Sequence, residues 1–115
     1  MTDALSDHII VCGFGALGRA VARELQDAEA RYVAIGGQEG AGAASILGIP
    51  FVGGEPSDPA SLHAAGIERA RALVACSGSD AEDLATTRAA RELRADLPIA
   101  ACHSGEESHK LTRAG

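Results

Sequence analysis

The chain has 115 residues, a length typical of one domain, and a formal net charge of −6 at pH 7. This charge argues against a nucleic-acid partner, because proteins that bind nucleic acid need a basic surface to displace counterions. No apolar run approaches the roughly 20 residues that a membrane-spanning helix needs, and the polar, acidic N-terminus does not resemble a signal peptide. We therefore expect a cytoplasmic domain that does not itself insert into a membrane.

Five short apolar runs predict β-strands, and no sixth strand is expected after them. The runs cover residues 8–12, 31–35, 50–52, 72–76 and 98–102. Because they are apolar on both faces, they are typical of a parallel sheet that helices cover on each side. A sheet that stops at five strands indicates that residues 1–115 are a single domain from a longer protein.

Helical patterns alternate with these runs. Leu17, Val21 and Leu25 recur at four-residue spacing and predict a first helix with one buried stripe. The stretch 36–48 contains five glycines, so any helix there is expected to be weak.

The later helices are predicted from their end signals. Asp58 before Pro59 predicts a helix start, and Gly66 predicts its end. Ser79 begins a capping box that opens a long helix to about residue 95, and Ser104 begins a second box that opens a last helix. The order βαβαβαβαβα, with right-handed crossovers, predicts an α/β fold with a doubly wound, Rossmann-like parallel sheet.

A glycine loop joins the first strand to the first helix, in the context that gives the pattern G-x-G-x-x-G its meaning. The first glycine allows a tight turn, the second lets a pyrophosphate approach, and the third lets the helix pack on the sheet. The helix N-terminus then offers free N–H groups to phosphate. The predicted contacts in this loop are Gly13, Phe14, Gly15, Ala16, Leu17 and Gly18. The alternative is a purely structural turn.

The ribose end of the predicted site departs from the usual pattern. Gly36 ends the second strand, where an Asp or Glu is expected to bind the ribose hydroxyls. Each lost charge-assisted hydrogen bond weakens binding by about 1.5–3 kcal/mol. Glu39 could substitute if the loop folds back. A 2′-phosphate would fit beside Gly36, but no Arg or Lys stands close to it in sequence.

Other strand ends complete the predicted rim. Glu55 follows the third strand, Ser77 the fourth and His103 the fifth. Each also has a structural explanation: a solvated loop carboxylate, a turn residue before a helix, and a surface histidine.

Three cysteines, Cys12, Cys76 and Cys102, have neither a disulfide nor a zinc spacing. Each ends a predicted strand, where a free cysteine behaves as a small hydrophobic residue. A redox or metal cluster that includes His103 is the alternative.

Four segments together resemble the regulator of potassium conductance domain, also called the TrkA-N domain. The family typically begins with a His-Ile-Ile-Val-Cys-Gly-Phe-Gly type of segment, as in residues 8–15, and continues with a Gly-Asp-Ala-Ser-Asp type, to which residues 54–58 correspond with two changes. Its Leu-x-x-Ala-Gly-Ile-x-x-Ala segment matches residues 62–70, and its closing Leu-x-x-Ala-Gly matches residues 111–115. The resemblance runs nearly from end to end.

The resemblance implies a regulatory module rather than an enzyme. Such domains lie at the inner face of the cell membrane as part of a potassium channel, transporter or antiporter. They bind NAD(H), ATP, ADP or AMP, and they form homodimers, often within rings. Three departures at the rim are Gly36 for the ribose-binding acid, Glu55 for the loop Asp, and His103 for a common Arg. They indicate an altered ligand or a pocket that no longer binds one.

Two other functions remain open from the sequence. One is the cofactor domain of an NAD-dependent dehydrogenase, although no pair of residues looks catalytic. The other is a ligand-free dimerisation module that packs through small residues of the long fourth helix, among them Ala85, Ala89 and Ala90.

Overall fold

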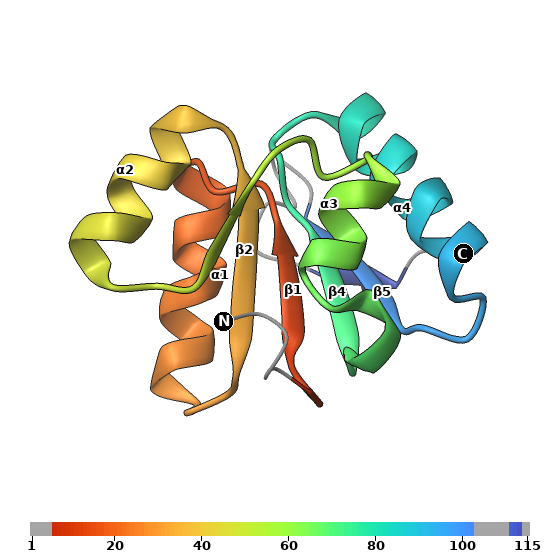
Figure 1. Ribbon diagram of the computed structural model, residues 1–115, viewed down its shortest axis with the longest axis horizontal. Helices are drawn as coiled ribbons and strands as arrows, with labels where there is room; N and C mark the ends of the chain where they lie inside the picture. The colour runs from red at the N-terminus through yellow and green to blue at the C-terminus, as the bar shows by residue number, and fades with distance from the viewer. Residues whose placement is uncertain (1–5, 103–110, 114–115) are drawn as a thin grey trace.

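The computed structural model describes residues 6–102 and 111–113, and it shows helices packed on both faces of one sheet (Figure 1). The strands are β1 (Ile9–Cys12), β2 (Tyr32–Gly36), β3 (Phe51–Gly53), β4 (Ala72–Ala75), β5 (Ile99–Cys102) and β6 (Leu111–Arg113). The helices are α1 (Ala16–Asp27), α2 (Gln38–Leu47), α3 (Pro59–Ala64), the 3₁₀ helix η2 (Ile67–Arg69) and α4 (Asp80–Leu93).

The strand order is β3-β2-β1-β4-β5-β6, and the pairs among β1 to β5 are all parallel. From β1 the chain runs outward through β2 to β3 on one side, and it then returns to form β4 on the other side of β1. The point where the direction reverses, between β1 and β4, leaves a crevice at the carboxyl ends of the strands. The five parallel strands and the doubly wound architecture confirm the predicted fold class.

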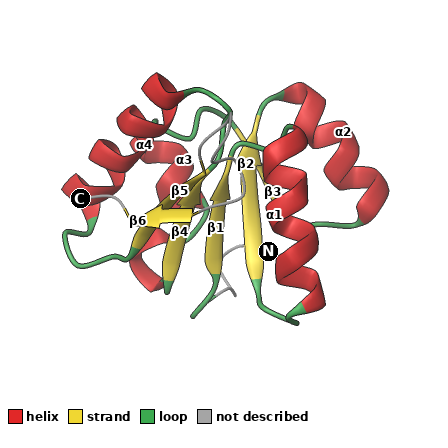
Figure 2. Cartoon of the chain, turned by 180° about the vertical axis from the view of Figure 1, so that it is seen from behind, coloured by secondary structure: helices red, strands yellow, loops and turns green. Residues whose placement is uncertain are grey.

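Two hydrophobic clusters cover the two faces of the sheet. Alternate residues of each strand point to opposite faces, so Ile10 and Cys12 of β1 join one cluster while Val11 joins the other. Leu62 of α3 and Ala90 of α4 pack in the first cluster. Ala22 of α1 and Ala44 of α2 pack in the second. Figure 2 shows these helix pairs on either side of the strands.

Most of the predicted helix signals are confirmed. The side chain of Asp58 accepts a hydrogen bond from the Ala60 N–H at 3.0 Å, and Gly66 follows α3 in the left-handed conformation with φ of 79°. Ser79 accepts from the Glu82 N–H at 3.3 Å and begins α4. The stripe of α1 differs in detail: Leu17, Val21 and Leu25 are partly buried, whereas its fully buried residues are smaller.

The end of the chain differs from the prediction. Leu111–Arg113 form β6, which pairs antiparallel with β5, so a sixth strand exists and these residues are not helical. The predicted capping box at Ser104 lies outside the described residues. An antiparallel edge strand on an otherwise parallel sheet is a common ending for folds of this kind.

Within the described part of the chain, no helix is both long and apolar enough to cross a membrane.

Candidate functional site

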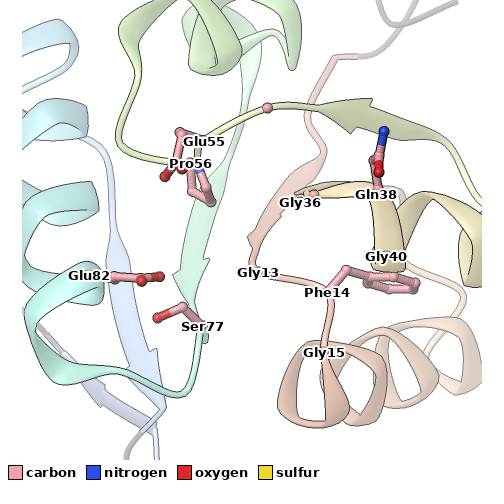
Figure 3. A pocket seen from close by; sticks show the side chains of 12 residues that line it. Gly13, Phe14, Gly15, Gly36, Gln38, Gly40, Glu55, Pro56, Ser77 and Glu82 are labelled. Carbon is pink, nitrogen blue, oxygen red and sulfur yellow. The ribbon is translucent and has the colours of Figure 1, made fainter.

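A cavity of about 580 Å³ opens beside the ends of the neighbouring strands β1 and β4 (Figure 3). It lies at the carboxyl ends of the parallel strands, which is where open α/β sheets bind their ligands. Its lining comes from the turns after β1, β2, β3 and β4 and from the starts of α2 and α4. The lining residues are Gly13, Phe14, Gly15, Gly36, Gly37, Gln38, Gly40, Gly54, Glu55, Pro56, Ser77 and Glu82.

The glycines of the loop after β1 have different physical roles. Gly13 has a φ of +102°, and a β-carbon there would lie 2.7 Å from Cα of Ser77. A β-carbon on Gly18 would lie 1.8 Å from the Gly13 carbonyl oxygen, so Gly18 lets α1 pack against the turn. A β-carbon on Gly15 would meet no atom within 4 Å. Gly13 and Gly18 are therefore needed for packing of the fold, whereas Gly15 leaves space in the cavity.

The N-terminus of α1 is open to an anion. Its N-cap is Gly15, which has no side chain to bond the free N–H groups, and the first turn carries no acidic residue. The first N–H groups of a helix lack intrahelical partners and carry a partial positive charge. A phosphate held at Gly15 would satisfy these donors.

The turn from β4 to α4 is closed by its own side chains. Ser77 donates from Oγ to Oδ1 of Asp83 at 2.7 Å, and its backbone N–H donates to the same oxygen at 2.9 Å. The Ser79 N–H donates to Oγ of Ser77 at 3.1 Å. Asp83 is 5% exposed, so this carboxylate is a buried anchor for the turn. Ser77 lines the cavity and also holds the turn together, as its structural explanation requires.

The opposite side of the cavity contains aromatic and glycine residues. Phe14 is buried, and its ring lies edge-to-face with that of Phe51, with centroids 6.0 Å apart. A β-carbon on Gly36 would lie 3.4 Å from Phe14 and from Phe51, and one on Gly40 would lie 3.0 Å from Phe14. Phe14 therefore favours a small residue at position 40, and a ribose-binding acid at position 36 would have its β-carbon in contact with Phe14 and with the ring of Phe51.

Carboxylates line the side of the cavity that faces the glycine loop. Glu55 follows β3, Glu82 projects from the first turn of α4, and Figure 3 shows both across the cavity from Gly13 and Gly15. Glu55, Pro56, Ser77 and Glu82 also line a smaller hollow of about 170 Å³ toward α4, so the two spaces adjoin. Gln38, the first residue of α2, is the polar side chain nearest the missing ribose acid in sequence.

The structure brings together six of the ten predicted site residues, namely Gly13, Phe14, Gly15, Gly36, Glu55 and Ser77. Ala16, Leu17 and Gly18 do not line the cavity: Ala16 faces a separate hollow beside α1, and Leu17 packs on the hydrophobic cluster. His103 lies outside the described residues. The role of all ten in ligand binding stays a prediction.

Sequence reasoning missed Gln38, Gly40, Pro56 and Glu82 as lining residues. Glu82 was visible only as the last residue of a capping box, a local signal that does not show what its side chain faces. His8 and His63 do not line the cavity. His8 is fully buried and donates from Nε2 to the Ala65 carbonyl at 2.7 Å, which ties β1 to the end of α3.

The described cysteines are core residues. Cys12 and Cys76 are buried and form no disulfide bond, and they belong to the hydrophobic clusters on opposite faces of the sheet. Burial raises the pKa of the Cys12 thiol far above its usual value, which keeps it protonated. Among residues 6–102 and 111–113, no group of His, Cys, Asp and Glu could hold a metal ion.

Comparison with known proteins gives a family match along almost the whole chain. The family model described as the TrkA-N domain matches residues 9–115. A protein of Alkalimonas amylolytica named K(+) efflux antiporter KefB is 32% identical over 114 residues, which cover 96% of this chain and 17% of that protein. Potassium channel protein 1 of Methanocaldococcus jannaschii is 32% identical over 116 residues, which cover 96% of this chain and 34% of that protein. The chain thus spans about a sixth to a third of these relatives.

Solved structures share the fold. The TrkA-N domain of inner membrane protein ybaL from Escherichia coli has a TM-score of 0.80 at 19% identity, covering 91% of this chain and 78% of that one. The GsuK channel bound to NAD has a TM-score of 0.71 at 24% identity, covering 90% and 19%. The Kef CTD of Shewanella denitrificans in its AMP-bound form has a TM-score of 0.71 at 22% identity, covering 82% and 56%.

Proposed function

Since the chain belongs to the TrkA-N domain family, we propose that it is a nucleotide-sensing regulatory domain of a potassium transport system and has no catalytic role. The ligand is NAD(H) or an adenine nucleotide such as ATP, ADP or AMP. It binds in the cavity between β1 and β4, and binding biases the arrangement of paired domains and so the gate. Such a bias requires that the ligand bind one arrangement more tightly than the other.

The observation that supports this most strongly is the pairing of an open helix end with an open cavity. Gly15 adds no side chain to a space of about 580 Å³, and this residue is also the N-cap of α1, whose N-terminus has no side-chain cap. A purely structural turn would have no need for this space at Gly15. The phosphate would lie at Gly15, with Gln38 on the ribose side and Ser77 and Glu55 on the opposite rim.

The relatives support the wider setting of the proposal. Two of them carry the names of a potassium channel and a K(+) efflux antiporter, and each is several times longer than the matched region. We infer that residues 1–115 are one domain of, or a subunit attached to, a membrane-embedded potassium channel or transporter. The domain would lie at the cytoplasmic face of the membrane and act as a homodimer.

The missing acid at Gly36 makes a ligand-free assembly module the second candidate. In α4, Ala90 is fully buried and Ala89 packs on the same cluster, so of the three small residues only Ala85 is exposed. Leu84 beside it is 53% exposed. These two residues would be the part of α4 available to a second copy.

A thermal-shift titration against NADH, NAD, NADPH, ATP, ADP and AMP tests the proposal. Stabilisation that grows with the logarithm of concentration above the dissociation constant is expected for at least one of them. No shift for any nucleotide at millimolar concentration, with a mass that depends on protein concentration, would leave assembly without a ligand as the function.

A further inference from the structure

Three helix N-termini contribute to the cavity, those of α1, α2 and α4, and those of α1 and α4 differ in what they offer to an anion. That of α1 is uncapped and has no acidic residue in its first turn. That of α4 carries Asp80, Glu82 and Asp83 in its first turn. Two of the N–H groups at this end are also occupied, because the Ser79 N–H donates to Ser77 Oγ and the Glu82 N–H donates to Ser79 Oγ. The N-terminus of α1 is therefore the more favourable of the two for a phosphate.

The charged side chains that line the cavity are all negative. Glu55 and Glu82 belong to its twelve lining residues, which include no Lys, Arg or His. Both glutamates are exposed, and neither carboxylate has a hydrogen-bond or ion-pair partner among the described residues. No described side chain therefore neutralises this wall, and its negative potential acts on any ligand in the cavity.

We propose that the cavity selects among nucleotides by charge, and that Glu82 is a specificity-determining residue. This inference rests on the proposed function. Nucleotides whose phosphates all fit at the N-terminus of α1, such as AMP and NAD(H), bind. Triphosphates bind more weakly, because their additional phosphates meet Glu55 and Glu82 instead of a cation.

The expected size of the effect follows from Coulomb's law. An exposed carboxylate about 8 Å from an added phosphate charge weakens binding by roughly two- to tenfold at low salt, depending on the effective dielectric constant. The Debye length is about 30 Å at 0.01 M ionic strength and about 3 Å at 1 M, so high salt removes most of the discrimination.

Isothermal titration calorimetry on the wild-type chain, Glu82→Gln and Glu92→Gln tests this, with AMP, ATP, NADH and NADPH in low-salt buffer containing EDTA. Glu92 is exposed near the C-terminal end of the same helix and does not line the cavity, so Glu92→Gln changes the net charge equally and serves as the matched control. The Glu82 side chain accepts no bond in the cap, so Glu82→Gln leaves the start of α4 intact.

The wild type is expected to bind AMP more tightly than ATP by about tenfold when both carboxylates act. NADH and NADPH should bind with similar affinity, because the 2′-phosphate of NADPH would lie beside Gly36 and Gln38, across the cavity from Glu82. Glu82→Gln should narrow the ratio of AMP to ATP affinity by roughly threefold, Glu92→Gln should leave it unchanged, and salt near 1 M should reduce it in the wild type.

Three results would overturn the inference. Equal or tighter binding of ATP than AMP would leave the proposed function standing and remove the charge selection. If ATP binds more tightly than AMP only after millimolar Mg²⁺ is added, the carboxylates recruit a cation and do not repel the phosphates. Failure of all four nucleotides to bind any of the three proteins would contradict the proposed function itself.

Discussion

Gly18 in the first turn of α1 lies directly against the backbone of Gly13: a β-carbon on Gly18 would stand 1.8 Å from the Gly13 carbonyl oxygen. No side-chain rearrangement relieves such a contact, because both partners belong to the backbone. Gly18→Ala must therefore displace α1 from the sheet, and we expect a loss of stability of about 3 kcal/mol, at the upper end of overpacking effects. Urea unfolding followed by circular dichroism measures it.

Gly42 is the matched control for this substitution. It is exposed in α2, and a β-carbon there would meet nothing within 4 Å. Gly42→Ala is expected to stabilise the protein by up to about 1 kcal/mol through helix propensity. A Gly18→Ala protein as stable as the wild type would contradict the packing shown at the glycine loop.

Gly15→Val separates ligand binding from folding. The valine side chain would enter open space in the cavity, and the backbone φ of −87° at this position lies outside the left-handed region that favours glycine. Stability should change by less than about 0.5 kcal/mol, as for substitutions away from packed features, whereas nucleotide binding should be lost because the methyl groups occupy the phosphate position. Calorimetric titration and thermal unfolding of the same sample give both quantities. Unchanged affinity would place the ligand elsewhere.

Local sequence signals were sufficient to predict much of the fold. The apolar runs that became β1 to β5 and the caps at Asp58 and Ser79 depend on residues close together in the chain. The helix α2 was expected to be weak from its glycines, yet it forms, and tertiary packing explains this: Ala44 is buried, and Gly40 gives Phe14 the room that a larger residue would fill. β6 was missed because Leu111–Arg113 form no apolar run and follow the predicted capping box at Ser104, which favoured a helix.

The part of the candidate site that lies at the ends of β-strands could be predicted from the sequence. Gly13, Gly36, Glu55 and Ser77 come directly after β-strands or end them, and parallel strands bring these positions to one edge. Glu82 lies in a helix, and its place across the cavity depends on the packing of α4 on the sheet. Gly18 was correctly assigned to helix packing, but its exclusion from the cavity lining required the structure.

The Ser77–Asp83 pair is expected to contribute to stability as a unit. Asp83→Ala removes an acceptor that serves both the hydroxyl and the N–H of Ser77, and it leaves the partly buried N–H of Ser77 without this acceptor. We expect a loss of about 2–3 kcal/mol. Ser77→Ala should cost about 1–2 kcal/mol, since the backbone bond to Asp83 remains.

The double variant gives the coupling between the two side chains. Because the two side chains share one network, their effects should not add. The double variant should lose about 1 kcal/mol less free energy of unfolding than the sum of the two single losses. Strict additivity in urea unfolding would mean that the two side chains contribute independently and not through their shared hydrogen bond.

The buried thiols are expected to be unreactive in the folded protein. Cys12 and Cys76 are each 1% exposed, and burial raises the pKa of the Cys12 thiol, so the reactive thiolate is disfavoured and inaccessible. A Cys102→Ser variant removes the third thiol, whose surroundings the structure does not describe. Ellman's reagent should then label no thiol within minutes in buffer at pH 8, and both thiols in guanidinium chloride. Raising the pH to 9 should not lead to labelling of Cys12 in the folded protein, because that pH remains far below the raised pKa of its thiol. Rapid labelling of one thiol in the folded variant would revive the redox interpretation of these cysteines.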